Sequence, residues 1–167
     1  MGIGIVGLGK LGCSLAVGLK REGFVISGLY SKNAESVKHI NERLGTSLEN
    51  SMANTVNNSE IVFITVPDSG IEDIAREISS GISSENLYGK VFVHCSGVLS
   101  SLVLKTLEEK GAYTCSLHPM QTFADKETGW KGLYGIYYGF EGHSRAYEIL
   151  MPIILSFKGK ILSIDKE

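Results

Sequence analysis

Two side chains in this sequence are of types suited to proton transfer, and each follows an apolar run. Ser96 comes shortly after the run 91–93, and His118 comes directly after the run 112–117. Pro119 holds the backbone of His118 in an extended conformation. A hydroxyl and an imidazole can pass a proton to or from the oxygen of a carbonyl or an alcohol, and histidine exchanges protons near neutral pH. Ser96 and His118 are therefore the catalytic candidates.

The other histidines, and Ser96 itself, have structural interpretations. Ser96 is also suited to capping a helix or closing a turn, because its hydroxyl can accept a backbone N–H. His94 ends a buried run and is interpreted as a structural histidine bonded within the fold. His39 is expected on a solvated helix face, and His143 is expected to be a surface or capping group. His118 is thus the strongest catalytic candidate.

The first twelve residues, MGIGIVGLGKLG, contain a glycine pattern that is typical of dinucleotide binding. An apolar run precedes Gly7-Leu8-Gly9-Lys10-Leu11-Gly12, which fits G-x-G-x-x-G, and an amphipathic stretch follows. In this order Gly7 permits a tight turn, Gly9 lets the backbone approach a pyrophosphate, and Gly12 lets the helix pack closely on the strand. The first N–H groups of the helix then face the phosphates. These six residues are predicted to bind the cofactor; the alternative is a glycine-rich turn that binds nothing.

A second predicted cofactor contact is the turn Tyr30-Ser31-Lys32-Asn33, which follows the apolar run 24–29. An enzyme that uses NAD places an acidic residue at this point to bond the ribose 2′-hydroxyl. This turn contains no Asp or Glu, and Glu35 comes later, in the next predicted helix. Hydroxyl, ammonium and amide donors suit a 2′-phosphate, so NADP is favoured over NAD. In the alternative, Lys32 simply faces water.

A third predicted contact is Val66-Pro67-Asp68, at the end of the apolar run 61–66. Ligands of open α/β sheets lie at the carboxyl ends of strands, so these residues are expected beside the nicotinamide or its ribose. Ser96, at the next strand end, is predicted to join them. Alternatively, Asp68 and Ser69 cap the helix that follows.

Apolar runs alternate with helical stripes along the chain, without an internal repeat. The stripes predict helices over 10–22, 34–44, 71–78, 100–110 and 144–156, between strands over 3–6, 24–29, 61–66, 91–93, 112–117, 133–140 and 161–164. This alternation predicts an α/β fold with a doubly wound, mainly parallel sheet, a Rossmann-like NAD(P)-binding domain over residues 1–167. The strand ends at 66–68, 94–97 and 116–123 then meet at one edge of the sheet.

The length, net charge and cysteine content of the chain exclude several classes of protein. The 167 residues are enough for one domain with a sizeable core, and the net charge of −2 gives no sign of nucleic-acid binding. No apolar run is long enough to cross a membrane and the chain begins with a strand instead of a signal peptide, so we expect a cytoplasmic protein. Cys13, Cys95 and Cys115 suit neither a zinc site nor a disulfide framework, and no metal site is predicted.

The motifs described above occur in the same order in one known family. Val66-Pro67-Asp68, His94-Cys95-Ser96-Gly97, the string S-L-H-P-M-Q-T-F at 116–123 and Glu141-Gly142 follow the glycine motif. The sequence resembles the uncharacterised Rossmann-like proteins assigned as NADP oxidoreductases, which are related to pyrroline-5-carboxylate reductase, ketopantoate reductase and deazaflavin-dependent NADP reductase. The similarity covers nearly the whole chain, and the string at 116–123 is its most specific part.

The resemblance implies a helical C-terminal domain that completes the active site and makes a homodimer. This sequence ends at Glu167, about where that domain would begin. His118-Pro119-Met120 also looks like the H-P-M-x-G string of prephenate dehydrogenases, whose histidine contacts the substrate hydroxyl. Thr122 stands where those enzymes have glycine, which argues against transferring their substrate.

Two functions follow as expectations. The first is an NADP-dependent oxidoreductase, or its cofactor-binding domain, that acts on a small carbonyl, imine or hydroxy-acid substrate. The second is a non-catalytic NADPH-binding module with a regulatory or interaction role. In both, the expected partners are a small molecule and a second copy of the chain, with no nucleic acid and no membrane.

Overall fold

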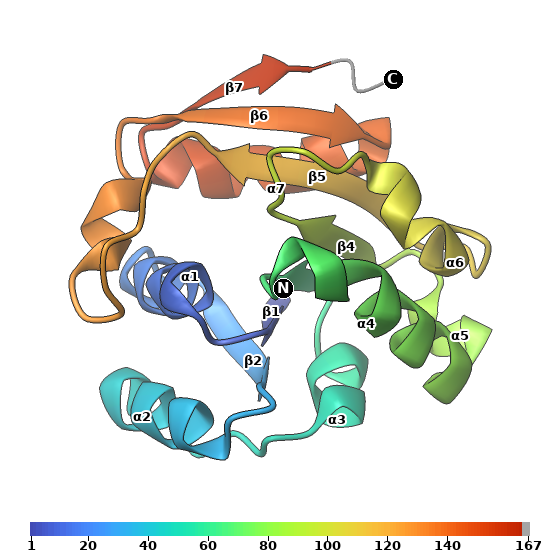
Figure 1. The fold of residues 1–167 in the computed structure, drawn as a ribbon, viewed down its shortest axis with the longest axis horizontal. Helices are drawn as coiled ribbons and strands as arrows, with labels where there is room; N and C mark the ends of the chain where they lie inside the picture. The colour runs from blue at the N-terminus through green and yellow to red at the C-terminus, as the bar shows by residue number, and fades with distance from the viewer. Residues whose placement is uncertain (165–167) are drawn as a thin grey trace.

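A computed structural model describes residues 1–164. Seven strands form one sheet in the order β2-β1-β3-β4-β5-β6-β7 (Figure 1). Strands β1 to β5 pair in parallel, β6 is antiparallel to β5, and β7 pairs in parallel with β6. The predicted mainly parallel sheet is therefore confirmed. The strands are β1 Gly2–Val6, β2 Val25–Tyr30, β3 Ile61–Ile64, β4 Val91–His94, β5 Tyr113–Pro119, β6 Tyr137–Gly142 and β7 Lys160–Ser163.

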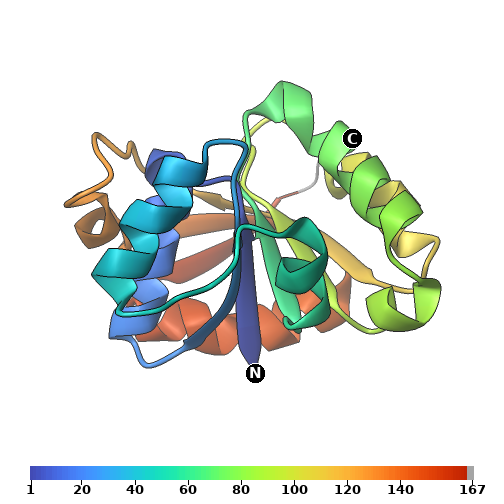
Figure 2. The ribbon, with the colours of Figure 1, turned by 90° about the horizontal axis from the view of Figure 1, so that it is seen from below.

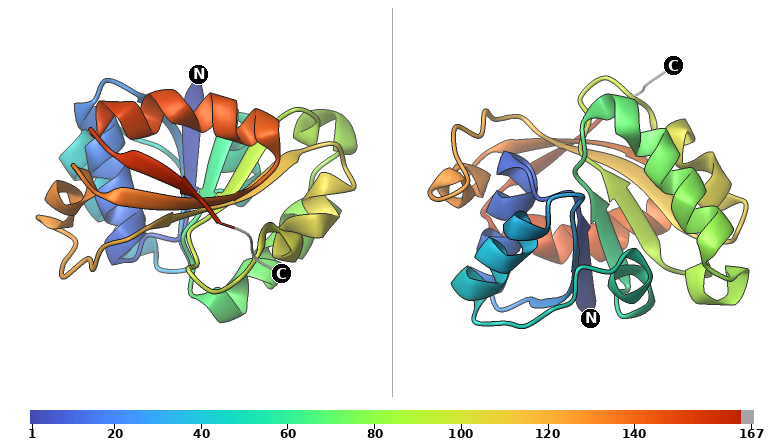
Figure 3. Two further views of the ribbon diagram at one scale, coloured as in Figure 1. Left: turned by 90° about the horizontal axis from the view of Figure 1, so that it is seen from above. Right: turned by 60° about the horizontal axis from the view of Figure 1, so that its bottom comes forward.

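Helices cover both faces of the sheet, so it is doubly wound, as predicted. Helices α1, α2 and α7 pack on one face, and α3, α4, α5 and α6 pack on the other (Figures 2 and 3). The bounds are α1 Lys10–Arg21, α2 Ala34–Leu44, α3 Met52–Asn57, α4 Asp68–Gly81, α5 Ser84–Leu87, α6 Lys105–Glu108 and α7 Ser144–Ser156, with 3-10 turns η1 Ser101–Leu104 and η2 Gly129–Leu133.

Strand β3 shows why continuous apolar runs suit this architecture. Its side chains alternate between the faces, as in any strand. Ile61 and Phe63 join the core under α1, α2 and α7, whereas Val62 and Ile64 join the core under α3 to α6. Because both faces are covered, every position is buried and the run shows no polar alternation.

Three predicted boundaries are wrong for identifiable reasons. The strand predicted over 61–66 ends at Ile64: the N–H of Thr65 still donates to Val6 at 2.8 Å, but Pro67 has no N–H to extend the pairing. The Thr65 hydroxyl instead donates to the carbonyl of Gly7 in the glycine turn, at 2.6 Å. The helix predicted over 100–110 divides into η1 and α6, where the Glu141 carboxylate accepts both the N–H and the hydroxyl of Ser101. The strand predicted over 133–140 begins only after Gly135, whose φ of 71° makes a turn.

The predicted helix cap at Asp68 and Ser69 is also wrong. Helix α4 begins at Asp68, and Pro67 stands at the capping position without a side-chain hydrogen bond. A carboxylate in the first turn still interacts favourably with the positive end of the helix. Asp68 therefore supports α4 by its charge and not by capping.

Candidate functional site

Two glycines of the turn between β1 and α1 are required by the fold itself. Gly7 has a φ of 97°, and a Cβ atom there would lie 2.8 Å from Cγ1 of Val66 and 2.9 Å from its backbone nitrogen. A Cβ atom at Gly12 would lie 2.0 Å from the carbonyl oxygen of Gly7 and 2.7 Å from Oγ1 of Thr65. Both glycines therefore have an internal structural reason, whatever the turn binds.

Gly9 differs from its two neighbours in the motif. Its φ of −77° and ψ of −164° are open to any residue, and a Cβ atom there would meet nothing within 4 Å. The residue precedes the twelve-residue helix α1, whose first turn contains no acidic side chain. The positive end of this helix thus opens on free space. Nothing in the described fold requires a glycine here.

This space belongs to a cleft of about 540 Å³ between the turns that follow β1, β2 and β3. Nine of the predicted cofactor residues line it: Gly7, Leu8, Gly9, Tyr30, Ser31, Lys32, Asn33, Val66 and Pro67. The other predicted contacts are not among its lining residues: Lys10, Leu11, Gly12, Asp68 and Ser96. Of these, Gly12 supports the turn by packing closely against the carbonyl group of Gly7.

The cleft also has walls that the sequence analysis did not find. Thr65 was hidden in an apolar run, although it is the only hydroxyl there. Helix α4 contributes residues one and two turns beyond the predicted site, and Lys126 comes from a connection 90 positions beyond Ser36, its neighbour in space. The missed lining residues are Ser36, Thr65, Ser69, Gly70, Asp73, Ile74, Glu77 and Lys126.

The turn after β2 is held by its own hydrogen bonds. Asn33 caps α2, since its side-chain oxygen accepts the N–H of Glu35 at 3.0 Å. The Ser31 hydroxyl accepts the N–H of Asn33 at 3.2 Å, and Asn50 bonds both backbone groups of Ser31 at 2.9 Å. The Lys32 side chain is exposed at the mouth of this ordered turn. The structure therefore presents the Lys32 ammonium group on an ordered backbone at the mouth of the cleft.

His118 lies at the carboxyl edge of the sheet, next to the end of β4. Its Nδ1 atom is 3.1 Å from the carbonyl oxygen of Cys95. Because a carbonyl oxygen can only accept, Nδ1 carries the proton in this bond, and Nε2 is the atom left for proton exchange. The ring lies over Gly97, where a Cβ atom would be 3.0 Å from Nε2. The imidazole is partly exposed and fixed in orientation, as a proton-transfer group requires.

Ser96 and His94 hold the backbone at this strand end. The Ser96 hydroxyl oxygen accepts the N–H groups of Val98 and Leu99, each at 3.1 Å, which is the turn arrangement allowed for it above. His94 is fully buried, accepts the N–H of Ser96 at Nδ1 and contacts the carbonyl oxygen of Ser100 through Nε2, each at 3.2 Å. The interpretation of His94 as a structural histidine is confirmed.

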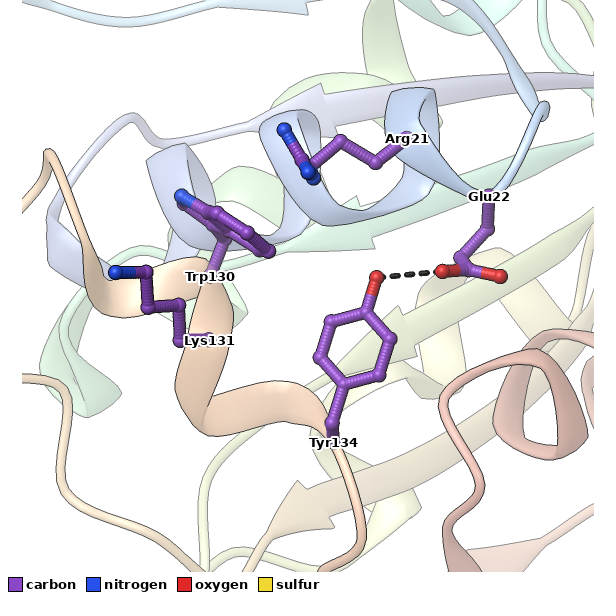
Figure 4. Close-up of a pocket in the computed structure, with 5 residues that line it drawn as sticks. All are labelled: Arg21, Glu22, Trp130, Lys131 and Tyr134. Carbon is purple, nitrogen blue, oxygen red and sulfur yellow. Dashed lines mark hydrogen bonds between the residues drawn. The ribbon is translucent and has the colours of Figure 1, made fainter.

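A second hollow, of about 650 Å³, lies at the other end of α1 (Figure 4). Its groups contact each other: the Arg21 guanidinium lies 4.0 Å from the ring centre of Trp130, and the Tyr134 hydroxyl donates to Glu22 at 2.5 Å. Burial and the Glu22 carboxylate raise the pKa of Tyr134 to about 12. These contacts hold η2 and the connection around it against α1.

A parallel sheet whose first strand leads through a glycine turn into a helix defines the class of dinucleotide-binding folds. A family model described as a Rossmann-like domain matches residues 1–119, and the chain belongs to this family. A search of curated proteins found no match. No helix in residues 1–164 is long and apolar enough to span a membrane.

Solved structures share the fold at low sequence identity. The candidate NADP oxidoreductase BF3122 from Bacteroides fragilis has a TM-score of 0.79 and 21% identity, with 98% of this chain and 60% of that chain covered. The imine reductase BcSIRED from Bacillus cereus has a TM-score of 0.78 and 18% identity, with 98% of this chain and 55% of that chain covered. Prephenate dehydrogenase from A. aeolicus, in complex with hydroxyphenyl propionate and NAD+, has a TM-score of 0.78 and 18% identity, with 99% of this chain and 60% of that chain covered. This chain thus spans less than two thirds of each of these chains.

Proposed function

We propose that the chain is the cofactor-binding domain of an NADP-dependent oxidoreductase that acts on a small carbonyl, imine or hydroxy-acid substrate. The observation that carries this proposal is Gly9: a glycine with unrestricted backbone angles, beside open space, at the positive end of α1. The names of the similar structures, BF3122 and BcSIRED among them, favour the same class of reaction.

The residues of the cleft divide the cofactor between them in this proposal. The backbone at 7–9 and the start of α1 hold the pyrophosphate, because their N–H groups and the helix dipole favour an anion. Ile74 of α4 supplies an apolar surface for the adenine, and Lys32 supplies a positive charge for the 2′-phosphate. Val66 and Pro67 border the path towards the nicotinamide end.

The nicotinamide, when bound, supplies the hydride. The contribution of the chain at that end is His118, whose Nε2 exchanges a proton with the substrate oxygen or nitrogen while the Cys95 carbonyl holds Nδ1–H. Ser96 acts by shaping the loop that carries Cys95 and Gly97, since its hydroxyl oxygen already accepts two backbone N–H groups. His118 is therefore the catalytic residue of this proposal.

A calorimetric titration with NADPH and then with NADH tests the cofactor assignment. The expected result is binding of both, with NADPH bound at least tenfold more tightly, because each charge-assisted hydrogen bond to the 2′-phosphate is worth about 1.5 kcal/mol. Equal affinities would contradict the choice of NADP, and failure to bind either would contradict the cofactor assignment.

The second candidate is a non-catalytic NADPH-binding module. It is favoured by the absence of Ser96 and His118 from the lining residues of the cleft. Turnover distinguishes the two functions: NADPH oxidation with a panel of cyclic imines and 2-oxo acids supports an enzyme if it is lost in His118→Ala. A homodimer and a cytoplasmic location stay predictions; the buried, unpaired state of all three cysteines agrees with a reducing compartment.

A further inference from the structure

We infer that Lys126 is a second specificity-determining residue for the 2′-phosphate of NADP, distant in sequence from Lys32 but in the lining of the same cleft. This inference rests on the proposed function and extends it to a residue outside the segments that contain the dinucleotide motif. Lys126 lines the same cleft as Lys32, Asn33 and Ser36. Its ammonium group donates to the hydroxyl of Ser36, in the first turn of α2, at 3.2 Å.

The connection that carries Lys126 is fixed on α2 by specific hydrogen bonds. The Arg43 guanidinium donates to the carbonyl oxygens of Lys126 and Glu127, at 2.6 and 2.8 Å. His39 of α2 also contacts the Glu127 carboxylate at 2.8 Å. The Asp125 carboxylate accepts the N–H groups of Glu127 and Thr128, at 2.7 and 2.6 Å, and so closes the turn. Lys126 is thus held over the cleft by contacts that leave its ammonium group at the wall.

The charges around the cleft are separated between two walls. Lys32 and Lys126 lie on the wall formed by the start of α2, whose dipole adds positive potential there. Within residues 1–164, neither ammonium group has a carboxylate at ion-pair distance. The acidic lining residues, Asp73 and Glu77, belong to α4 on the other side. An anion that enters is therefore directed to the two lysines, and the amino group of an adenine to the carboxylates.

Lys32 by itself gives only weak discrimination between NADP and NAD, since its side chain is exposed and its charge is screened by solvent. Lys126 is half-buried and already placed by Ser36 and Arg43, so it loses little side-chain entropy on binding a phosphate. It lines the cleft from the connection between β5 and η2, an element separate from the turn that carries Lys32. We assign to Arg43 a positioning role through Lys126.

The test compares adenosine 2′,5′-bisphosphate with adenosine 5′-monophosphate by calorimetry, so that only the adenosine half of the site is probed. Lys126→Gln is expected to weaken binding of the bisphosphate about tenfold and binding of the monophosphate less than twofold. Lys126→Gln combined with Lys32→Gln is expected to remove the preference. Lys38→Gln, on an exposed position of α2 outside the cleft, makes the same change of net charge and is expected to alter neither affinity.

Arg43→Gln is the test of positioning. It is expected to reduce the ratio of the two affinities several-fold while the monophosphate affinity stays within twofold of wild type, whereas a merely structural role would weaken both ligands alike. Circular dichroism of each variant shows that it is folded.

The outcomes separate the inference from the function on which it rests. If wild type prefers the bisphosphate and Lys126→Gln keeps that preference, or weakens both ligands equally, the role of Lys126 is refuted and the proposed function stands. If wild type binds the monophosphate equally well, or binds neither ligand, the NADP assignment itself fails and the inference fails with it.

Discussion

Gly9 and Gly12 belong to one motif, but we predict that substitution of Gly9 impairs binding whereas substitution of Gly12 impairs folding. The Gly12→Ala substitution places a Cβ atom 2.0 Å from the carbonyl oxygen of Gly7 and 2.7 Å from Oγ1 of Thr65. The Gly9→Val substitution places a side chain in space that is free for 4 Å around its Cβ atom. The first change should therefore damage the fold, and the second should damage only the binding of an anion.

The expected loss for Gly12→Ala can be worked from the contacts. Overpacking costs about 1–3 kcal/mol, and the upper end applies because the clash at Gly12 meets backbone atoms, which cannot rotate away. Alanine recovers about 1 kcal/mol of helix propensity in α1. The net destabilisation is about 2 kcal/mol, which lowers the melting temperature of a domain of this size by about 4–8 °C.

For Gly9→Val the expected loss is in the affinity for NADPH. The extended backbone angles at Gly9 suit valine, so the melting temperature should stay near that of wild type. A pyrophosphate kept away from α1 loses about two charge-assisted hydrogen bonds, about 3 kcal/mol together, and NADPH affinity should fall about a hundredfold. Gly81→Val is the matched control, since Gly81 also has open space around its Cβ position and lies outside the cleft.

Thermal melting and calorimetric titration of the three variants test these expected changes in stability and in NADPH affinity. Unchanged NADPH affinity in Gly9→Val would refute the cofactor role of the turn. A melting temperature for Gly12→Ala equal to that of wild type would refute the packing derived for Gly7 and Gly12. A fall in melting temperature for Gly9→Val alone would show that this glycine serves the fold and not a ligand.

Two further predictions concern groups outside the cleft. Burial, and then the hydrogen bond to Glu22, raise the pKa of Tyr134 to about 12 from an ordinary value of about 10. The neutral Tyr134 hydroxyl in this place therefore stabilises the fold below pH ~10, and this contribution is lost as the pH rises towards 12. Urea unfolding should show a steeper alkaline loss of stability for wild type than for Tyr134→Phe; parallel curves would contradict this. Burial raises the pKa of Cys95 to about 12, so iodoacetamide should label this thiol slowly in the native chain and rapidly in urea, and rapid native labelling would contradict its burial.

Local patterns in the sequence were sufficient for the order of the strands and of the longer helices, and for the three turns that border the cleft, whereas the short elements α3, α5 and η2 were not predicted. The run at 61–64 could be assigned to a strand because burial on both faces leaves only apolar residues, and the turn at 7–12 could be assigned because its glycine spacing reports local backbone geometry. Nine residues of the cleft were found in this way, since each lies at the end of a strand or in the turn that follows it.

The tertiary structure decided which chemistry each candidate can perform. Ser96 and His94 carry polar groups in the sequence, but their hydrogen bonds to the backbone of the same loop became visible only in the folded chain. Gly7 and Gly12 are distinguished from Gly9 by contacts with atoms across the turn and on the next strand. Lys126 joins Ser36 across 90 positions of sequence, because the connection after β5 returns over α1 and α2. Sequence spacing reports what lies within one turn or one strand, whereas a contact between distant segments depends on how the whole sheet is wound.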